Sequence, residues 1–101
     1  MKATPGAEKD KPRSVCREVT VSNKLGIHAR PAALFVKTAG RFRSDITVEK
    51  DGERVPGKSI MALMMLAAGK GSRLQITAEG DDAAEALDEL LKLFAAKFNE
   101  D

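Results

Sequence analysis

This chain of 101 residues has little cysteine, few aromatic residues and no strong excess of one charge. Its one cysteine, Cys16, cannot form a disulfide within the chain, so we expect a cytoplasmic protein with a free thiol at or near the surface. Tryptophan and tyrosine are absent, which disfavours stacking of aromatic side chains on nucleic-acid bases. The formal net charge is +2 and no long run of one sign occurs, so nothing favours nucleic-acid binding.

The first sixteen residues, MKATPGAEKDKPRSVC, lack a long apolar run. A signal peptide needs about seven or more apolar residues and a membrane span needs more, so we expect neither export nor membrane insertion. Alternating charges and two prolines in this segment favour a flexible tail at residues 1–15. The remaining residues, 16–101, are long enough for one small domain with one core.

Four segments alternate apolar and polar residues with the period of two that is typical of strands with one buried face. They lie at residues 17–23, 45–50, 54–55 and 72–80. Asp51-Gly52 separates the second segment from the third and is a preferred turn for a tight hairpin. These two strands should therefore be antiparallel neighbours.

The segment at residues 29–42 is predicted to be a helix. Pro31 lies in the first turn, where proline is tolerated, and Gly40 is a suitable C-terminal cap. Its apolar positions Ala33, Val36 and Ala39 are expected to face the core.

Two further helices are predicted. The first is short, with Ser59 as its N-terminal cap, and is expected to end at Gly69 and Gly71. The second follows Asp81 or Asp82 as its cap. The expected buried face of this last helix consists of Leu87, Leu90, Leu91, Phe94 and Phe98.

The order of these elements is βαββαβα, and each strand is apolar on one side only. This combination predicts an α+β open-faced sandwich, with a four-stranded antiparallel sheet covered on one face by three helices. A glycine-rich phosphate loop is absent from the sequence, so ATP is not an expected cofactor. Because no acid–base pair or set of metal ligands is visible either, we expect no metal and no other cofactor.

The only histidine, His28, lies in the segment GIHARPAA, where the first strand gives way to the first helix. A helix N-terminus attracts anions, because its first N–H groups have no partner within the helix and the helix dipole is positive there. An uncharged imidazole is a nucleophile that can accept and later release a phosphoryl group. Arg30 adds a planar donor fork suited to phosphate oxygens, and Pro31 fixes a backbone angle at the helix start.

A lone histidine at a helix start is more often a surface residue or a cap than a reactive group. Three features favour a phosphate-accepting site here over a hydrolytic one. Gly26 permits an unusual turn, Arg30 lies in the first helical turn, and His28 is expected to have no carboxylate, cysteine or second histidine as a neighbour.

Two segments, LGIHARPAALFVKTAGRF and GKSIMALMMLAAGKG, resemble the HPr family, the histidine-containing phosphocarriers of the bacterial phosphoenolpyruvate-dependent sugar phosphotransferase system. The resemblance runs from about residue 18 to residue 98 and includes the order of strands and helices. It implies that His28 accepts a phosphoryl group on Nδ1 from phosphorylated enzyme I and passes it to enzyme IIA proteins, with Arg30 assisting. Such a protein is a carrier that enzymes turn over rather than an enzyme acting alone, and its size suggests a monomer.

Ser59 occupies the position of the family's regulatory serine. The resemblance implies phosphorylation there by an ATP-dependent HPr kinase/phosphorylase, although a serine cap stabilises a helix by about 1 kcal/mol over alanine without any kinase. The short helix after Ser59 is apolar almost all round, so part of it must be exposed. We predict that Ile60, Met61 and Met64 form a docking patch for partner proteins beside the helix that starts at His28.

Other functions stay open. The segment NKLG at residues 23–26 resembles the nitrogen-related branch of the family, so the phosphoryl flow can serve regulation rather than sugar transport. Another alternative is a binding module that acts with a transcription regulator after serine phosphorylation, like the family's paralogue that lacks the histidine. The presence of His28 favours the relay. Nucleic-acid binding by the bare face of the sheet has no aromatic pair or basic stripe to support it.

Overall fold

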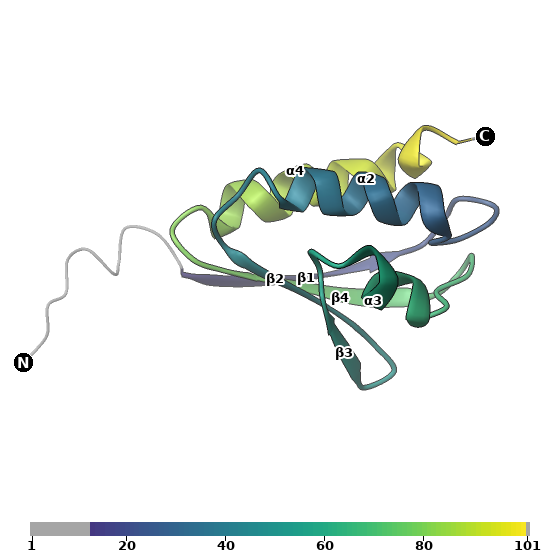
Figure 1. The fold of residues 1–101 in the computed structure, drawn as a ribbon, viewed down its shortest axis with the longest axis horizontal. Helices are drawn as coiled ribbons and strands as arrows, with labels where there is room; N and C mark the ends of the chain where they lie inside the picture. The colour runs from purple at the N-terminus through teal and green to yellow at the C-terminus, as the bar shows by residue number, and fades with distance from the viewer. Residues whose placement is uncertain (1–12, 101) are drawn as a thin grey trace, which may run out of the picture.

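A four-stranded antiparallel sheet forms one layer of the structure, a computed structural model that describes residues 13–100 (Figure 1). The strands are β1 (Ser14–Thr20), β2 (Asp45–Lys50), β3 (Glu53–Pro56) and β4 (Arg73–Glu79), in the spatial order β1-β4-β2-β3. The helices are α2 (Ala29–Ala39), α3 (Ile60–Met65) and α4 (Ala83–Ala95), followed by a 3₁₀ turn, η1 (Lys97–Asn99). The prediction of a βαββαβα open-faced sandwich is confirmed.

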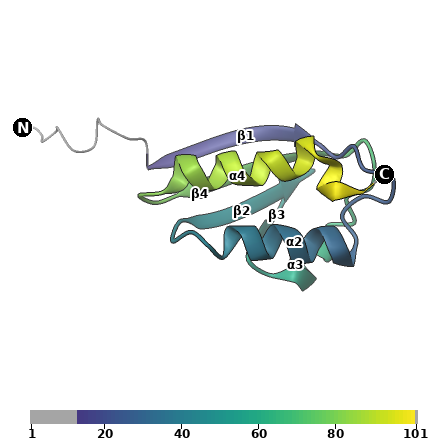
Figure 2. The ribbon, with the colours of Figure 1, turned by 90° about the horizontal axis from the view of Figure 1, so that it is seen from above.

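The helices lie on one face of the sheet. Figure 2 shows α2 and α4 side by side over the strands, with α3 next to α2, and both of these helix pairs are in contact. The turn between β2 and β3 is the predicted Asp51-Gly52 pair, in which both residues have a positive φ, of 52° and 86°. Such a pair matches the twist of a two-residue hairpin, so the sequence signal and the backbone agree.

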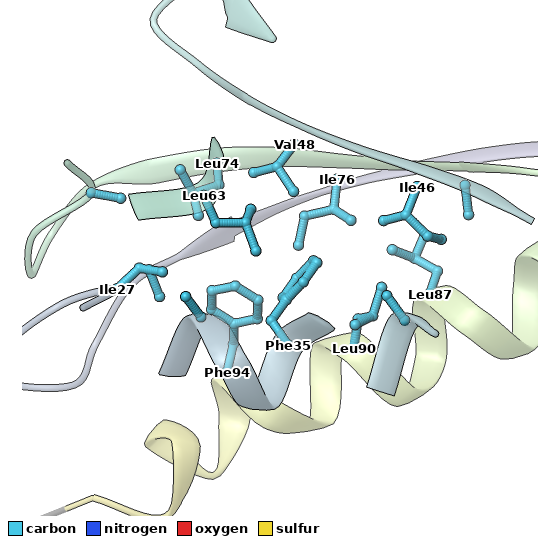
Figure 3. Close-up of a cluster of buried hydrophobic side chains, with 14 of the residues drawn as sticks. Ile27, Phe35, Ile46, Val48, Leu63, Leu74, Ile76, Leu87, Leu90 and Phe94 are labelled. Carbon is cyan, nitrogen blue, oxygen red and sulfur yellow. The ribbon is translucent and has the colours of Figure 1, made fainter. Parts of the chain in front are cut away.

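The core lies between the sheet and the helices (Figure 3). Two of its aromatic rings, Phe35 of α2 and Phe94 of α4, meet edge to face with their centroids 6.2 Å apart. This aromatic pair joins the two helices above the strands. Buried aliphatic side chains of the same core include Ile46, Val48, Leu63, Leu74, Ile76, Leu87 and Leu90. Leu63 comes from α3, so this short helix also closes the core.

The buried face of α2 differs from the prediction at two of three positions. Ala39 is buried as expected, but Ala33 is exposed and Val36 only half-buried. The helix instead turns Ala32 and Phe35 inward. Both sets fit the helical period, and burying the larger phenylalanine ring removes more apolar surface from water.

Strand β1 begins earlier than predicted. Ser14 and Val15, placed in the expected tail, belong to the sheet, because Val15 pairs with Ala78 of β4 and packs against the core. Residues 1–12 of that tail lie outside the described residues. Cys16 is exposed, which agrees with the expectation of a free thiol at or near the surface. Since Val15 faces the core, alternation along the strand directs Cys16 to the open face of the sheet.

The helix ends agree in part with the predicted caps. Gly40 is the C-terminal cap of α2, and Ser59 caps α3. Helix α3, however, ends at Met65, before the glycines predicted to end it, and Ala67 takes the left-handed conformation with a φ of 51°. Helix α4 ends at Ala95, so Phe98, predicted in the same helix, lies in η1 instead.

Asp82 stands at the start of α4, but its side chain makes no capping bond. Its carboxylate accepts hydrogen bonds from the N–H groups of Arg43 and Ser44, both 2.9 Å away, and from the Ser44 hydroxyl. The bond from that hydroxyl, followed by those from the two backbone groups, lowers the pKa of Asp82 below its ordinary value. The carboxylate therefore ties the loop before β2 to the start of α4, which the sequence did not reveal.

Within residues 13–100, no helix has the length and apolar character needed to cross a membrane.

Candidate functional site

His28 lies where the loop after β1 enters α2, as the sequence predicted. It is the N-cap residue of the helix, with extended backbone angles, and its carbonyl oxygen accepts a hydrogen bond of 3.0 Å from Ala32 N–H. The imidazole makes no capping bond to the helix, and its side chain is 37% exposed. The ring therefore lies at the positive end of α2, and its nitrogens are not used to cap the helix.

The loop before His28 has the unusual turn expected from Gly26. This glycine has a φ of 72°, and a Cβ added to it would lie 2.5 Å from the carbonyl oxygen of Ala68. That same oxygen accepts a hydrogen bond of 2.9 Å from Ile27 N–H. Only glycine fits this approach without displacing the neighbouring chain, so Gly26 fixes the direction in which the chain enters His28.

The first turn of α2 carries no acidic residue. Arg30, its second residue, is exposed, and Pro31, its third, is buried. The buried proline ring fixes the first turn, while the guanidinium is free to reach an anion in solvent. His28 and Arg30 thus both lie at the start of α2, where the helix dipole is positive, an arrangement suited to a phosphoryl group.

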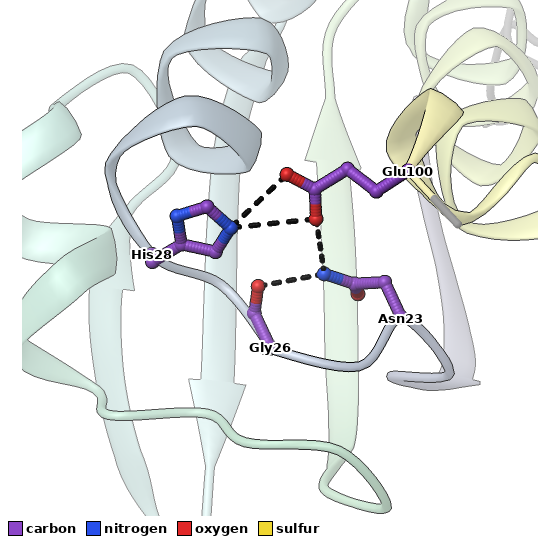
Figure 4. Close-up of polar contacts among 4 residues, drawn as sticks. All are labelled: Asn23, Gly26, His28 and Glu100. Atoms are coloured by element: carbon purple, nitrogen blue, oxygen red, sulfur yellow. Dashed lines mark hydrogen bonds and ion pairs between the residues drawn. The ribbon is translucent and has the colours of Figure 1, made fainter.

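A carboxylate, that of Glu100, lies beside the ring, and the prediction that His28 has no such neighbour is wrong. Nε2 of His28 is 3.1 Å from Oε2 and 3.3 Å from Oε1 of Glu100 (Figure 4). The Glu100 side chain is 18% exposed. The carboxylate is thus mostly buried and the histidine partly exposed, so this ion pair is less open to solvent than a pair of fully exposed surface side chains.

Sequence reasoning missed Glu100 because it lies 72 residues after His28. The contact depends on the end of α4, where Lys97, Phe98 and Asn99 have positive φ values of 53°, 54° and 61°. Non-glycine residues seldom adopt this conformation, and no local pattern predicts three in succession. The one available signal was the apolar Phe98, which is buried with its ring centroid 4.8 Å from that of Phe94.

Asn23 connects Glu100 to the loop before His28. Its Nδ2 donates to the carbonyl oxygen of Gly26 at 2.7 Å and to Oε1 of Glu100 at 3.1 Å. The Asn23 residue is 1% exposed, and its Oδ1 is buried without a hydrogen-bond partner in the described part of the chain. Buried amides are costly unless bonded, so this side chain fixes the geometry of both the loop and the carboxylate.

Ser59 is the N-cap of α3, as predicted. Its hydroxyl oxygen accepts a hydrogen bond of 3.1 Å from Ala62 N–H. This bond satisfies one of the backbone donors that α3 leaves unpaired at its start. The residue is half-buried.

The three predicted patch residues of α3 are exposed. The exposed fractions are 41% for Ile60, 73% for Met61 and 42% for Met64. Two further apolar side chains that the prediction did not include, Met65 on α3 and Leu25 in the loop before His28, are also exposed. We call these five residues the apolar patch. Because α3 packs against α2, the patch and the helix that starts at His28 belong to one layer (Figure 2).

The exposed apolar patch on the layer that carries His28 suits contact with another protein. Two open hollows, of about 340 and 400 Å³, lie elsewhere, one between β1 and α4 and one over the open face of the sheet. Across residues 13–100, no three His, Cys, Asp or Glu side chains are placed to hold a metal ion. His28 and Arg30 thus lie at the N-terminal end of α2 and line neither of these hollows.

Comparisons with known proteins agree with this geometry. The family model for the PTS HPr component phosphorylation site matches residues 15–96. The phosphocarrier protein HPr of Pseudomonas aeruginosa is 51% identical over 84 residues, which cover 82% of this chain and 93% of that protein.

Two solved structures are also similar. A crystal structure of HPr from Thermoanaerobacter tengcongensis has a TM-score of 0.83 and 47% identity, covering 86% of this chain and 98% of that one. A crystal structure of Crh, a catabolite-repression protein of Bacillus subtilis that forms a dimer by domain swapping, has a TM-score of 0.63 and 49% identity. That match covers 80% of this chain and 88% of Crh.

Proposed function

This chain belongs to the HPr family, the phosphocarriers of the phosphotransferase system, and we propose that its phosphoryl acceptor is Nδ1 of His28. The observation that carries the proposal is the place of this ring. It is the N-cap residue of α2, it is partly exposed, and it makes no capping bond. The matched phosphorylation-site model spans residues 15–96 and so includes His28, the one histidine in the chain.

The end of α2 supplies the electrostatics for the transfer. The unpaired N–H groups of the first turn and the positive end of the helix dipole stabilise the oxygens of an incoming phosphoryl group. Arg30 adds a full positive charge and a planar fork of donors from the exposed side. The buried ring of Pro31 holds this first turn in place, so the donors need no rearrangement when the phosphoryl group arrives.

The donor and the acceptors are other proteins, and we assign them from the family. Phosphorylated enzyme I supplies the phosphoryl group and enzyme IIA proteins receive it, each docking on the apolar patch beside α2. Exposed methionines suit such a surface, because their unbranched side chains adapt to more than one partner. The place of action is the cytoplasm, the carrier is a monomer between encounters, and neither nucleic acid nor membrane insertion takes part. Light scattering of the purified protein tests the monomer.

Ser59 is a regulatory phosphorylation site in this proposal, used by an HPr kinase/phosphorylase. A phosphate there adds between one and two negative charges at neutral pH, and its oxygens can accept the bond that the hydroxyl accepts from Ala62 N–H. The cap is then kept while the docking surface becomes more acidic. We expect phosphorylation to weaken docking to enzyme I, and equal rates of His28 phosphorylation for wild type and Ser59→Asp would contradict this.

A regulatory role without sugar transport is the second candidate. The similarity to Crh supports it, as does the NKLG segment at residues 23–26. In this version phosphorylation at Ser59 governs binding to a transcription regulator, or the phosphoryl flow through His28 serves nitrogen-related control. Binding to a transcription regulator under the control of Ser59 would make no use of the imidazole. The presence of His28 therefore favours the phosphoryl carrier over that binding module.

The deciding experiment is intact-mass analysis after incubation with phosphoenolpyruvate and enzyme I, on wild type and His28→Ala. Under the proposal, wild type gains one acid-labile phosphoryl group and the variant gains none. The enzyme I preparation is first shown to be active on another carrier. If wild type then stays unmodified, the relay is refuted and the Ser59-switched binding module becomes the better assignment.

A further inference from the structure

The ring of His28 has two nitrogens in different surroundings. Nε2 faces both carboxylate oxygens of Glu100, at 3.1 and 3.3 Å, whereas Nδ1 points away from them (Figure 4). A carboxylate only accepts hydrogen bonds, so the bond forms only when Nε2 carries the proton. In an uncharged ring the other nitrogen then has a free lone pair. The contact thus selects one of the two tautomers of the imidazole.

Glu100 is held in place from both sides. Asn23, which is buried, donates its amide N–H groups to Oε1 of Glu100 and to the carbonyl oxygen of Gly26. Since both partners are acceptors, the amide has only one orientation that satisfies them. On the chain itself, Phe98 is buried two residues before Glu100 and anchors the segment. The carboxylate is therefore part of a network that includes the loop leading to His28.

We propose that Glu100 is a positioning residue for phosphoryl transfer, which keeps the proton on Nε2 of His28 and directs the lone pair of Nδ1 outward. The inference rests on the proposed phosphoryl acceptance by His28 and adds to it a residue from the far end of the chain. Asn23 belongs to the same device, because it fixes the carboxylate and the loop together.

The proton stays on Nε2 throughout the transfer. The lone pair of Nδ1 attacks the phosphorus atom of the donor's phosphoryl group, the new N–P bond forms, and the bond from phosphorus to the donor's atom breaks with its electron pair going to the donor. The ring then carries a positive charge shared by both nitrogens, which the Glu100 carboxylate stabilises. When the next protein's nucleophile attacks phosphorus, the N–P bond breaks with its electron pair returning to Nδ1.

The carboxylate does not stand in the way of the phosphoryl group. It lies on the Nε2 side of the ring, whereas the phosphoryl group arrives at Nδ1. The positive charge for the phosphoryl oxygens comes from the first turn of α2, which carries Arg30, whereas the negative charge of Glu100 stabilises the Nε2 side of the ring. Because the two groups are on opposite sides of the ring, the negative Glu100 carboxylate can stabilise the ring without repelling the negative phosphoryl group at close range.

The test combines two measurements on the full chain. The first is the ¹⁵N NMR spectrum of the imidazole at a pH where the ring is uncharged, which reports the tautomer without assignment because the chain has one histidine. The second is the rate of phosphoryl transfer from phosphorylated enzyme I. The variants are Glu100→Gln, which keeps the size but removes the charge, and Glu100→Ala.

The matched control is Glu79→Gln. Glu79 is exposed and pairs with Ser14 at the beginning of β1, whereas the His28 loop follows the end of that strand. The Glu79→Gln substitution therefore removes the same charge as Glu100→Gln, but at the other end of the sheet. Thermal unfolding of each variant verifies that it is folded.

We expect the wild-type ring to carry its proton on Nε2, and Glu100→Gln and Glu100→Ala to show more of the tautomer protonated at Nδ1. Their transfer is expected to be about tenfold slower, the lower end of what is lost when the carboxylate behind a metal-binding histidine is removed. Glu79→Gln should match wild type in both measurements.

An unchanged tautomer in the Glu100 variants overturns the inference, even if transfer slows, because the residue then acts through docking. A changed tautomer with an unchanged rate overturns it as well. If wild type and Glu79→Gln also accept no phosphoryl group, the proposed function has failed and the inference fails with it.

Discussion

Replacing Gly26 with alanine tests how the loop places His28. A Cβ at this position would lie 2.5 Å from the Ala68 carbonyl oxygen and 2.7 Å from Gly69 Cα, so one chain must move away from the other. The movement strains or breaks the hydrogen bond of 2.9 Å from Ile27 N–H to Ala68. A buried donor left unpaired costs about 1–3 kcal/mol.

The backbone conformation adds a second cost. At a φ of 72°, alanine is disfavoured relative to glycine by about 1–2 kcal/mol. Gly52→Ala is the matched control, because Gly52 also has a positive φ, of 86°, but has no heavy atom within 4 Å of an added Cβ. The two variants share the conformational strain and the entropy change of the unfolded chain. Their difference therefore measures the close approach alone.

Equilibrium unfolding in urea is the assay. We expect Gly26→Ala to lose about 2–5 kcal/mol of unfolding free energy, the sum of the two costs, and Gly52→Ala to lose only the conformational cost of about 1–2 kcal/mol. Phosphoryl transfer to His28 should slow in the first variant only, because only that loop leads to the ring. Equal stabilities for the two variants, within about 0.5 kcal/mol, would refute the reasoning about the Ala68 contact.

Three further predictions concern other parts of the molecule. Phe98→Ala should cost about 3–5 kcal/mol in urea unfolding, since the ring is buried against Phe94. For Asp82, a folded-state pKa below the ordinary value means that its contribution is complete above about pH 4 and is lost as the pH falls through the folded value. The stability gap between wild type and Asp82→Asn should accordingly close in acid, and a gap that does not change with pH would contradict this. Met61→Lys should change stability by less than about 0.5 kcal/mol but slow transfer from enzyme I, because the side chain is 73% exposed on the apolar patch.

Local patterns in the sequence predicted most of this fold. Alternation located β2, β3 and β4, but it predicted the first strand at residues 17–23 whereas β1 is Ser14–Thr20. The Asp51-Gly52 turn and the Ser59 cap were both found where the sequence placed them. These features depend on residues that are neighbours in the chain, which is why a single sequence reveals them. The inward face of α2 was wrong because two sets of apolar positions share the helical period, and only the shape of the core selects Phe35.

The sequence predicted the part of the candidate site that lies at the start of α2, but it missed the part contributed by the end of the chain and by the loop before His28. His28, Arg30 and Pro31 are consecutive or nearly so, and the sequence places them at the start of α2. Glu100 and Asn23 were missed, because their contact with each other spans 77 positions and depends on a left-handed turn that no sequence pattern predicts. Long-range polar contacts of this kind require the folded chain.

The position of Cys16 has a practical consequence. It is the only thiol in the chain, it is exposed, and it lies on the open face of the sheet, opposite to the helix layer that carries His28 and the apolar patch. A fluorophore coupled to it through a maleimide would therefore mark every molecule once and leave the helix layer uncovered. Binding of partner proteins to the helix layer can thus be followed by fluorescence anisotropy of a label on Cys16, without introducing a cysteine by mutation.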